Sequence, residues 1–269
     1  MRLRVTLPAI LLLLFTVSHL AAGRSPDPTR ARLAVVARLA AFTERDFDAL
    51  SSNAESGDRE AQFWLGSIYE QGRLVPKDRE AAESWFLKSA TKGYAPAERA
   101  LGVLYSYDHA KAALWLRRAA QQGDSEAQFW LGTGYEQGLF GKTNYREAGD
   151  WFQKAAKQGH PDAQASLGQM YEEGEGVKQN YKMAAQWYRK AAEHVPDLGG
   201  AGQGRNNLGL LYLKGLGVSK DYFQAYFWFS LASVQANASY AKAHMTQEEI
   251  AKAERMANDW KSRHPPKSR

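Results

Sequence analysis

The sequence of 269 residues contains no cysteine. Disulfide bonds, thiolate catalysis and cysteine-based metal sites are therefore excluded, and packing alone must stabilise the fold. A strong excess of one charge is also missing, because the sequence has 35 basic and 29 acidic residues and a formal net charge of +6. Only the tail over 261–269 is markedly basic. Since nucleic-acid binding needs a basic face interleaved with stacking aromatics, we expect no nucleic-acid partner.

Long apolar runs are missing except near the N-terminus. Arg2 and Arg4 precede an apolar run that begins at Leu7, and the small residues Ala21-Ala22-Gly23 follow. This order predicts a secretory signal peptide over 1–23, cleaved after Ala22 or Gly23. The run is short for a spanning helix, which needs about 20 residues, although a retained anchor stays the alternative. We therefore expect an exported chain, periplasmic or secreted, without a membrane span after cleavage.

Catalytic and ligand-binding motifs are absent as well. The 6 histidines show no metal-ligand spacing, and His109, His160 and His194 fall near loops or helix ends, where solvated histidine is common. The glycine-rich stretch 199–204 has no preceding strand and no following Lys-Ser/Thr, so it matches neither nucleotide motif. We expect no cofactor, no metal and no enzyme activity.

The sequence does contain five copies of one pattern, which opens with Gly and has Leu-Gly at the ninth and tenth places, Tyr at the thirteenth, and then Ala-x-x-Trp. The Leu-Gly pairs begin at Leu65, Leu101, Leu131, Leu167 and Leu208, and the tryptophans are Trp85, Trp115, Trp151, Trp187 and Trp228. A fixed period of this length is typical of an all-α solenoid of stacked helix–turn–helix units.

Each copy predicts two helices with different apolar faces. Ala61, Leu65 and Tyr69, at places 5, 9 and 13 of the first copy, share one face of a helix. A glycine at the tenth place costs about 1 kcal/mol inside a helix, so its recurrence predicts close approach of the second helix. The tryptophan, with alanine three places earlier, is interpreted as a core residue of the second helix. Glycines such as Gly93 are expected to end these helices.

The repeats set the domain boundaries. We place them at 57–92, 93–122, 123–158, 159–199 and 200–236; the second lacks about six residues between its helices, and the fourth has an insertion at 194–199. An N-terminal linker and capping helices are expected over 24–56. A C-terminal capping helix is expected within 237–262, started by a capping box of Thr246 and Glu249. The basic tail 263–269 is expected to be disordered.

The best-formed copy reads Gly159-x-x-x-Ala163-x-x-x-Leu167-Gly168-x-x-Tyr171, then Asn180-Tyr181-x-x-Ala184-x-x-Trp187-x-x-x-Ala191-Ala192. Over 57–236 the chain resembles the Sel-one-like repeat (SLR) family, a relative of the tetratricopeptide repeat. The resemblance implies a right-handed α-superhelix that acts as a protein–protein adaptor, often exported in bacteria. Cysteine-rich relatives have been linked to β-lactam binding or hydrolysis, but they carry disulfides that this chain lacks, so that link transfers poorly.

The resemblance also indicates where a partner would bind. Places 7, 11, 14 and 15 of each repeat, counted from its opening glycine, belong to the first helix. They point away from the predicted core and would line the concave groove of the superhelix. These candidate partner-binding residues are Phe63, Ser67, Glu70, Gln71, Arg99, Val103, Tyr107, Phe129, Thr133, Glu136, Gln137, Gln169, Glu172, Glu173, Asn206, Leu210 and Lys214. Phe63-Trp64 and Phe129-Trp130 are either aromatic anchors for a peptide or packing between neighbouring repeats, and the sequence leaves both open.

The function that we predict is a monomeric, non-enzymatic scaffold that binds another protein through the concave face. One alternative is a hydrolase acting on a cell-wall or β-lactam-like substrate, which would need a nucleophile and base brought together in space. A second alternative is a peptidoglycan- or polysaccharide-binding module, in which groove aromatics would stack on sugars.

Overall fold

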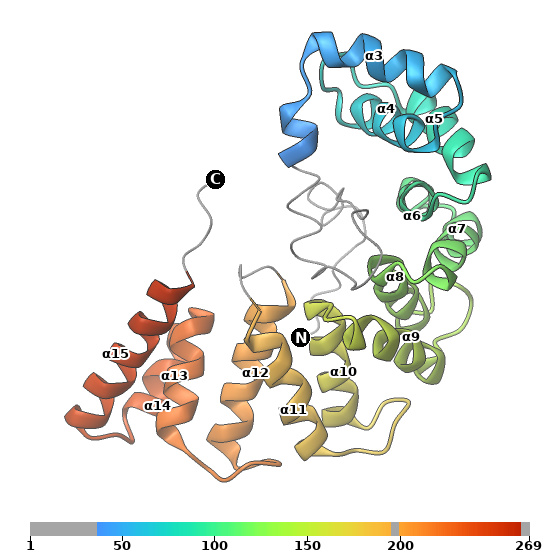
Figure 1. Cartoon of the computed structure of the whole chain (residues 1–269). Helices are drawn as coiled ribbons and strands as arrows, with labels where there is room; N and C mark the ends of the chain where they lie inside the picture. Colours follow the sequence, from blue (N-terminus) through green and yellow to red (C-terminus); the bar gives the residue numbers. More distant parts are fainter. Residues whose placement is uncertain (1–36, 195–198, 265–269) are drawn as a thin grey trace. The chain divides into compact units, whose positions relative to one another are not determined.

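The computed structural model describes residues 37–194 and 199–264 (Figure 1). The predicted signal peptide, residues 24–36 of the predicted linker and capping region, and residues 265–269 of the basic tail lie outside these ranges. Within the described ranges the chain consists of helices joined by turns and has no strand. None of the helices in these ranges combines the length and the apolar character that a membrane crossing requires.

The chain divides into two compact units, of which the first ends at Thr143 and the second begins at Asn144. The first unit contains α3 (Glu44–Glu55), α4 (Arg59–Gln71), α5 (Arg79–Thr91), α6 (Ala95–Leu104), α7 (His109–Gln121) and α8 (Ser125–Glu136). The second contains α9 (Tyr145–Lys157), α10 (Pro161–Glu173), α11 (Tyr181–Ala192), α12 (Gly200–Lys214), α13 (Tyr222–Ala232), α14 (Gln235–Lys242) and α15 (Gln247–Arg263).

Helices pack against their neighbours in chain order within each unit. In the first unit α4 packs on α5 and α6 on α7, and α5 and α7 each contact the helix that follows. In the second unit α10 packs on α11 and α12 on α13, while the first helices α10 and α12 also touch each other. The predicted all-α solenoid of stacked helix pairs is thereby confirmed.

The helices begin where a side chain can cap the free backbone amides. Asp58, Asp78, Asp108 and Asp124 each accept a hydrogen bond from the amide three residues further on. Asn144, Asn180 and Asp221 cap helices of the second unit in the same way. Such a cap stabilises a helix by about 1 kcal/mol, so the sequence sets the start of most helices locally. The second helices of the first three repeats end as predicted at glycines with positive φ, which are Gly93, Gly123 and Gly159 at 68°, 94° and 89°. The α11 helix of the fourth repeat has Glu193 as its C-cap instead.

The glycine at the tenth place brings the two helices of a pair together. A Cβ atom on Gly66 would lie 2.7 Å from Phe86 Cδ1, and one on Gly168 would lie 2.6 Å from Tyr188 Cδ1. Gly102 faces Leu116 and Gly209 faces Phe229 at similarly short distances. No real side chain fits there, so the predicted reason for these glycines is confirmed.

The large side chain that packs against each of these glycines belongs to the residue directly after the repeat tryptophan. Phe86 and Tyr188 have no exposed surface, whereas Trp85 and Trp115 are only half-buried. A cation three residues further on covers the outer face of the indole, as Lys88 Nζ does 3.7 Å from the Trp85 ring centroid. The interpretation of every tryptophan as core was therefore too simple.

Both ends of the array are capped by further helices. The region 24–56, expected to hold a linker and capping helices, contains α3, whose Ala54 is fully buried. At the other end the predicted capping box of α15 is present, because Glu249 Oε2 accepts the Thr246 amide at 2.8 Å. The region 237–262, expected to hold one capping helix, also contains most of the short helix α14, which the sequence analysis did not identify.

We predict that the tenth-place glycine cannot be replaced. Gly168→Ala drives a methyl group into the buried Tyr188 ring and should lower the free energy of unfolding by about 1–3 kcal/mol. Gly149→Ala in α9 is the matched control, because its added Cβ meets only the flexible Met170 side chain, at 3.0 Å from Cε. Urea unfolding of both variants checks this, and equal stabilities would contradict it.

Candidate partner-binding surface

Three of the predicted groove residues are buried, which corrects their assignment. Phe63 is 2% exposed and lies between Phe86, at 5.9 Å between ring centroids, and Tyr94, at 5.6 Å. Tyr94 directly precedes the first helix of the next repeat, so the seventh place of α4 faces that repeat rather than solvent. Trp64 is also 2% exposed. The pair Phe63-Trp64 therefore belongs to the core between repeats.

Ser67 and Arg99 are buried for related reasons. The Ser67 hydroxyl donates to the Phe63 carbonyl four residues earlier, at 2.9 Å. Arg99 Nε lies 3.0 Å from Asp124 Oδ2, and this ion pair is almost fully shielded from solvent. Because Asp124 also caps α8, the pair ties α6 to the start of the next repeat's first helix. Neither side chain is available to a partner.

The remaining candidates of the first unit are half-buried or exposed. Phe129 is half-buried beside the buried Trp130, with 5.3 Å between their ring centroids. Tyr107 is 74% exposed, more than any other large hydrophobic residue that the structure describes. Val103, Thr133, Glu70 and Glu136 are half-buried, while Gln71 and Gln137 are exposed. Their role in binding stays a prediction.

In the second unit the candidates form part of a row of carboxamides. Asn237 of α14 donates to Asn206 of α12 at 3.1 Å, and Gln203 of α12 reaches Gln169 of α10 at 3.5 Å. Gln169 in turn donates to the exposed Glu173 at 3.0 Å. A carboxamide offers two donor hydrogens and two acceptor lone pairs, so these contacts leave hydrogen-bonding capacity toward solvent. The row runs across the alternate helices α10, α12 and α14.

The other candidates in this unit frame the carboxamide row. Lys214 is exposed and Leu210 half-buried on α12. Glu172 is half-buried and accepts the hydroxyl of Tyr188 at 2.7 Å. Burial of the Tyr188 ring, reinforced by this carboxylate, raises the pKa of its phenol. Glu172 thus helps to hold the core of its repeat together.

A polar contact that sequence reasoning missed joins consecutive repeats. The glutamines at the sixth place donate to a carbonyl near the end of the preceding helix: Gln62 to Ala54 and Gln128 to Ala120 at 3.0 Å, and Gln164 to Ala156 at 3.1 Å. All three glutamines are buried, and each adds a second hydrogen bond to a carbonyl that already accepts the amide of the closing glycine, as Ala54 accepts that of Gly57 at 3.1 Å. The recurrence of glutamine at this place was the available signal.

The fifth repeat has Arg205 in the sixth place. Its guanidinium donates to the carbonyls of Ala192 and His194 at 3.0 and 2.9 Å, and it stacks 4.7 Å from the Trp260 ring centroid. The negative end of the α11 dipole stabilises this buried cation. Arg205 therefore fixes the start of the insertion after α11 and attaches the capping helix α15 to the repeats.

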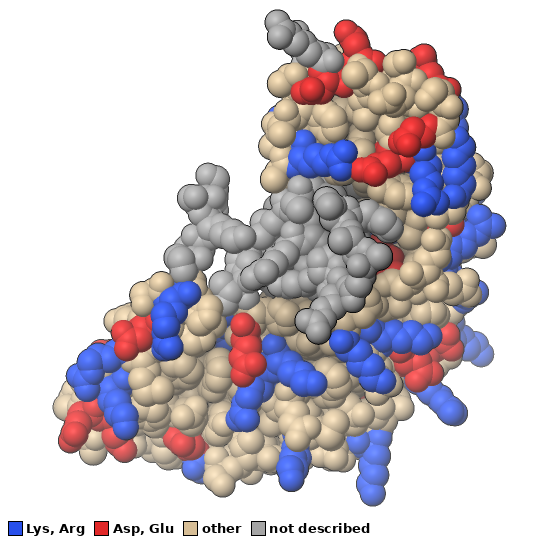
Figure 2. Space-filling view, viewed as in Figure 1, with Lys and Arg blue, Asp and Glu red and all other residues tan. Residues whose placement is uncertain are grey.

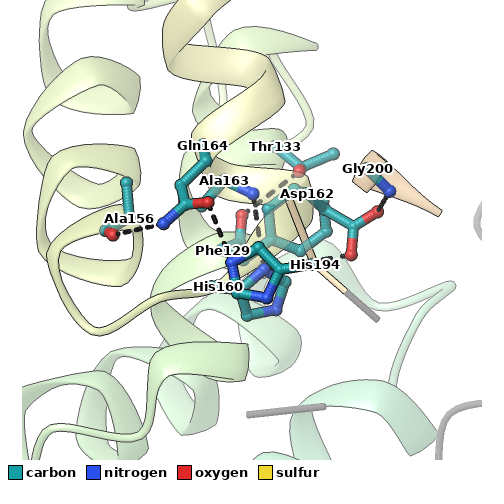
Figure 3. Close-up of polar contacts among 9 residues, drawn as sticks. All are labelled: Phe129, Thr133, Ala156, His160, Asp162, Ala163, Gln164, His194 and Gly200. Carbon is teal, nitrogen blue, oxygen red and sulfur yellow. Dashed lines mark hydrogen bonds and ion pairs between the residues drawn. The ribbon is translucent and has the colours of Figure 1, made fainter. Parts of the chain in front are cut away.

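His160 departs from the expectation of a solvated histidine, because its side chain has no exposed surface. Its Nδ1 accepts the Ala163 amide at 3.3 Å and so caps α10 where other repeats use aspartate (Figure 3). Beside it, Asp162 accepts the Gly200 amide at 2.8 Å, and His194 bonds Gln164 at 3.1 Å. The contacts of Asp162 and His194 hold both ends of the insertion against α10. His160, as the cap of α10, has a structural role.

The charged surface is mixed. On the face drawn in Figure 2, lysine and arginine side chains lie among aspartate and glutamate side chains rather than in one patch. Within the described ranges no group of three histidine or carboxylate side chains is placed to hold a metal ion.

Comparison with known proteins identifies the repeat. A family model of the Sel1 repeat matches residues 59–94, 95–124, 125–160, 161–194 and 203–237. The chain belongs to the Sel1 repeat family. Proteins of this family are generally scaffolds for protein interactions.

Two solved structures share the fold. A protective antigen of uropathogenic Escherichia coli with an SLR fold is 33% identical, with a TM-score of 0.74, and the alignment covers 81% of this chain and 48% of that one. A Sel1 repeat protein from Oxalobacter formigenes is 31% identical, with a TM-score of 0.60, over 69% of this chain and 74% of that one.

A curated relative from Mus musculus, the DAP3-binding cell death enhancer 1, is 38% identical over 81 residues, or 29% of this chain and 16% of its own length. Chitin synthase regulatory factor 3 of Schizosaccharomyces pombe is 31% identical over 111 residues, which cover 38% of this chain and 12% of that protein. This chain therefore spans less than a fifth of the curated relatives it matches and about half of the uropathogenic antigen.

A pH-dependent prediction follows from Glu98, which occupies the sixth place of the second repeat. Burial raises the pKa of its carboxyl above the ordinary value, although Arg118 and the Gln122 amide counteract the shift. A raised pKa in the folded state means that stability falls as the pH rises through it. Glu98→Gln replaces the buried carboxylate with a neutral amide and so removes this pH-dependent loss of stability. It should raise the free energy of unfolding by about 1 kcal/mol at pH 7.

The gain from Glu98→Gln should vanish at low pH, where the native carboxyl is protonated. Urea unfolding at pH 3.5 and pH 7 measures both values, with Glu55→Gln on the exposed surface of α3 as the control. A gain that is independent of pH would contradict this account of Glu98.

Proposed function

We propose that the chain is an exported scaffold that binds a protein partner through the exposed side of its first helices, called here the first-helix face. The observation that carries this proposal is the carboxamide row of the second unit. Gln169, Gln203, Asn206 and Asn237 come from the alternate helices α10, α12 and α14, and their contacts with one another leave hydrogen-bonding capacity for a partner. The second helices, in contrast, place the residue after the repeat tryptophan on a glycine in the core.

The first-helix face suits partner binding physically. Its side chains sit on rigid helices, so little conformational entropy is lost when a partner docks. The carboxamides offer neutral hydrogen bonds, Leu210 adds apolar surface, and the exposed Glu173 and Lys214 supply charges of opposite sign. Contacts from several repeats would add up, which favours a partner segment that spans more than one repeat.

The relatives support a role in binding other proteins. The mouse relative is named for binding DAP3, and the fission-yeast relative is named as a regulatory factor of chitin synthase. Because the alignments cover only a small part of either relative, their partners are not transferred to this chain.

Export is the second part of the proposal. It is supported by the basic start, the apolar run and the small residues Ala21-Ala22-Gly23 of the sequence. The similar Escherichia coli protein is a protective antigen, which agrees with a place in the cell envelope.

We predict that photo-crosslinking will map the partner to the first-helix face. A benzophenone amino acid at Gln203 or Lys214 of α12 should give a covalent product with one envelope protein. The same amino acid at the exposed positions Gln186 or Lys190 of α11 should give none, because these lie on a second helix. Mass spectrometry of the products from cells reads out the result.

Equal crosslinking from both helices, or from α11 alone, would contradict the first-helix face. Circular dichroism of the four labelled proteins checks that each one folds. The earlier candidate Phe63 is unsuitable as a probe, because replacing a side chain with 2% exposure would disturb the core.

A separate prediction concerns export. When the full chain is produced in a bacterium, the mature protein should lie in the periplasm or medium and begin at Gly23 or Arg24. Cell fractionation followed by N-terminal sequencing measures both properties. Retention of the first 23 residues on a cytoplasmic protein would contradict export while leaving the proposed binding face intact.

A further inference from the structure

The second unit contains a cleft at the end of the fifth repeat, between its second helix α13 and the helices α14 and α15, which we call the C-terminal cleft. Figure 1 shows these three helices at the end of the array. The cleft has a volume of about 400 Å³. This falls within the range of small-ligand sites, which is roughly 300–1,000 Å³. The first-helix face, on α10 and α12, is a different surface.

Small side chains leave room for the cleft. The neighbouring helices contribute Ala238 from α14 and Ala257 from α15, both nearly fully buried, and Ser239 at the edge. Phe229 and the Tyr226 ring, also buried, complete an apolar floor. These floor side chains are already nearly fully buried, so an apolar group of a few carbon atoms placed on them would lose its own contact with water.

The rim of the cleft is polar and carries three charges. Lys242 Nζ lies 3.3 Å from Glu254 Oε1, and the Tyr226 hydroxyl donates to the same oxygen at 2.9 Å. Glu254 is thus engaged by two donors, and its charge is balanced by Lys242. The lysine on the other side of the cleft has no such partner.

Lys261 supplies a positive charge that no carboxylate neutralises within the part of the chain that the structure describes. Its ammonium donates to the carbonyl of Ser230, in the last turn of α13, at 3.2 Å. An ammonium group has three donor hydrogens, so this contact leaves two for a ligand. Asn258, which also lines the cleft and is exposed, can add an amide donor beside it.

We propose that the C-terminal cleft binds a carboxylate that carries an apolar group. The carboxylate lies against Lys261 and Asn258, and the apolar group lies on Phe229, Ala238 and Ala257. A single negative charge matches the net charge of +1 that Lys242, Lys261 and Glu254 give the rim. A doubly charged phosphate fits less well, because Glu254 repels it and the floor cannot hydrogen-bond it. Such a carboxylate is found at the C-terminus of a polypeptide and in a small carboxylic acid.

Calorimetric titration of the mature chain tests the proposal with three probes: a pentapeptide that ends in phenylalanine, the same peptide with an amidated C-terminus, and 3-phenylpropionate. Both free acids should bind and the amidated peptide should not. Tighter binding of the peptide acid would point to a polypeptide terminus, and tighter binding of phenylpropionate to a small acid. Either order of affinities supports the proposal that the C-terminal cleft binds a carboxylate.

Two variants locate the site. Lys261→Gln removes the unpaired charge and should weaken binding of either acid about tenfold or more. Lys252→Gln removes the same charge from α15 at a position that does not line the cleft and should leave affinity unchanged. Circular dichroism confirms folding of both. Equal binding of the acid and amidated peptides, an unchanged affinity in Lys261→Gln, or no binding of either acid would overturn the proposal.

Discussion

The close contact between a helical glycine and a bulky side chain is the constraint on which the rest of this structure depends. Gly66, Gly102, Gly168 and Gly209 let the second helix of a pair approach so near that an added Cβ would lie within 3 Å of a neighbouring side chain. The residue after the repeat tryptophan fills the gap and becomes the centre of the pair. This contact fixes both the distance between the helices and the face that each turns inward.

The second helices place one bulky residue on a glycine of the first helix, and in the second unit α10 and α12 keep polar side chains such as Gln169 and Gln203 at least partly exposed. Buried glutamines then connect one repeat to the next, and Arg205 performs this task in the last repeat while also contacting the capping helix. Buried hydrogen bonds thus join the repeats, while the exposed carboxamide of Gln203 keeps hydrogen-bonding capacity for a partner. The exposed side chains of the first-helix face are therefore available to a partner.

The repeat pattern was sufficient to predict the fold, since the spacing of Leu65-Gly66, Tyr69 and Trp85 encodes two packed helices and a turn. It was not sufficient for the surface. Phe63 was a groove candidate with packing between repeats left open, and the structure decides for packing, because its ring lies on Tyr94 at the start of the next repeat. The cap that His160 makes is local, but histidine is not among the preferred N-cap residues, so the pattern did not indicate it. The cleft beside α14 was missed because it depends on how α13, α14 and α15 pack together.

A double-mutant cycle on Gly209 and Phe229 tests the central claim most directly. Gly209→Ala introduces a methyl group 2.6 Å from Phe229 Cε1, and Phe229→Leu removes the ring atoms it would meet. If the contact sets the spacing of the pair, the two changes together should destabilise the protein by at least about 1 kcal/mol less than the sum of the single effects. Additive effects within about 0.3 kcal/mol would show that the glycine is not kept for this contact, and the account of the helix pair would fail.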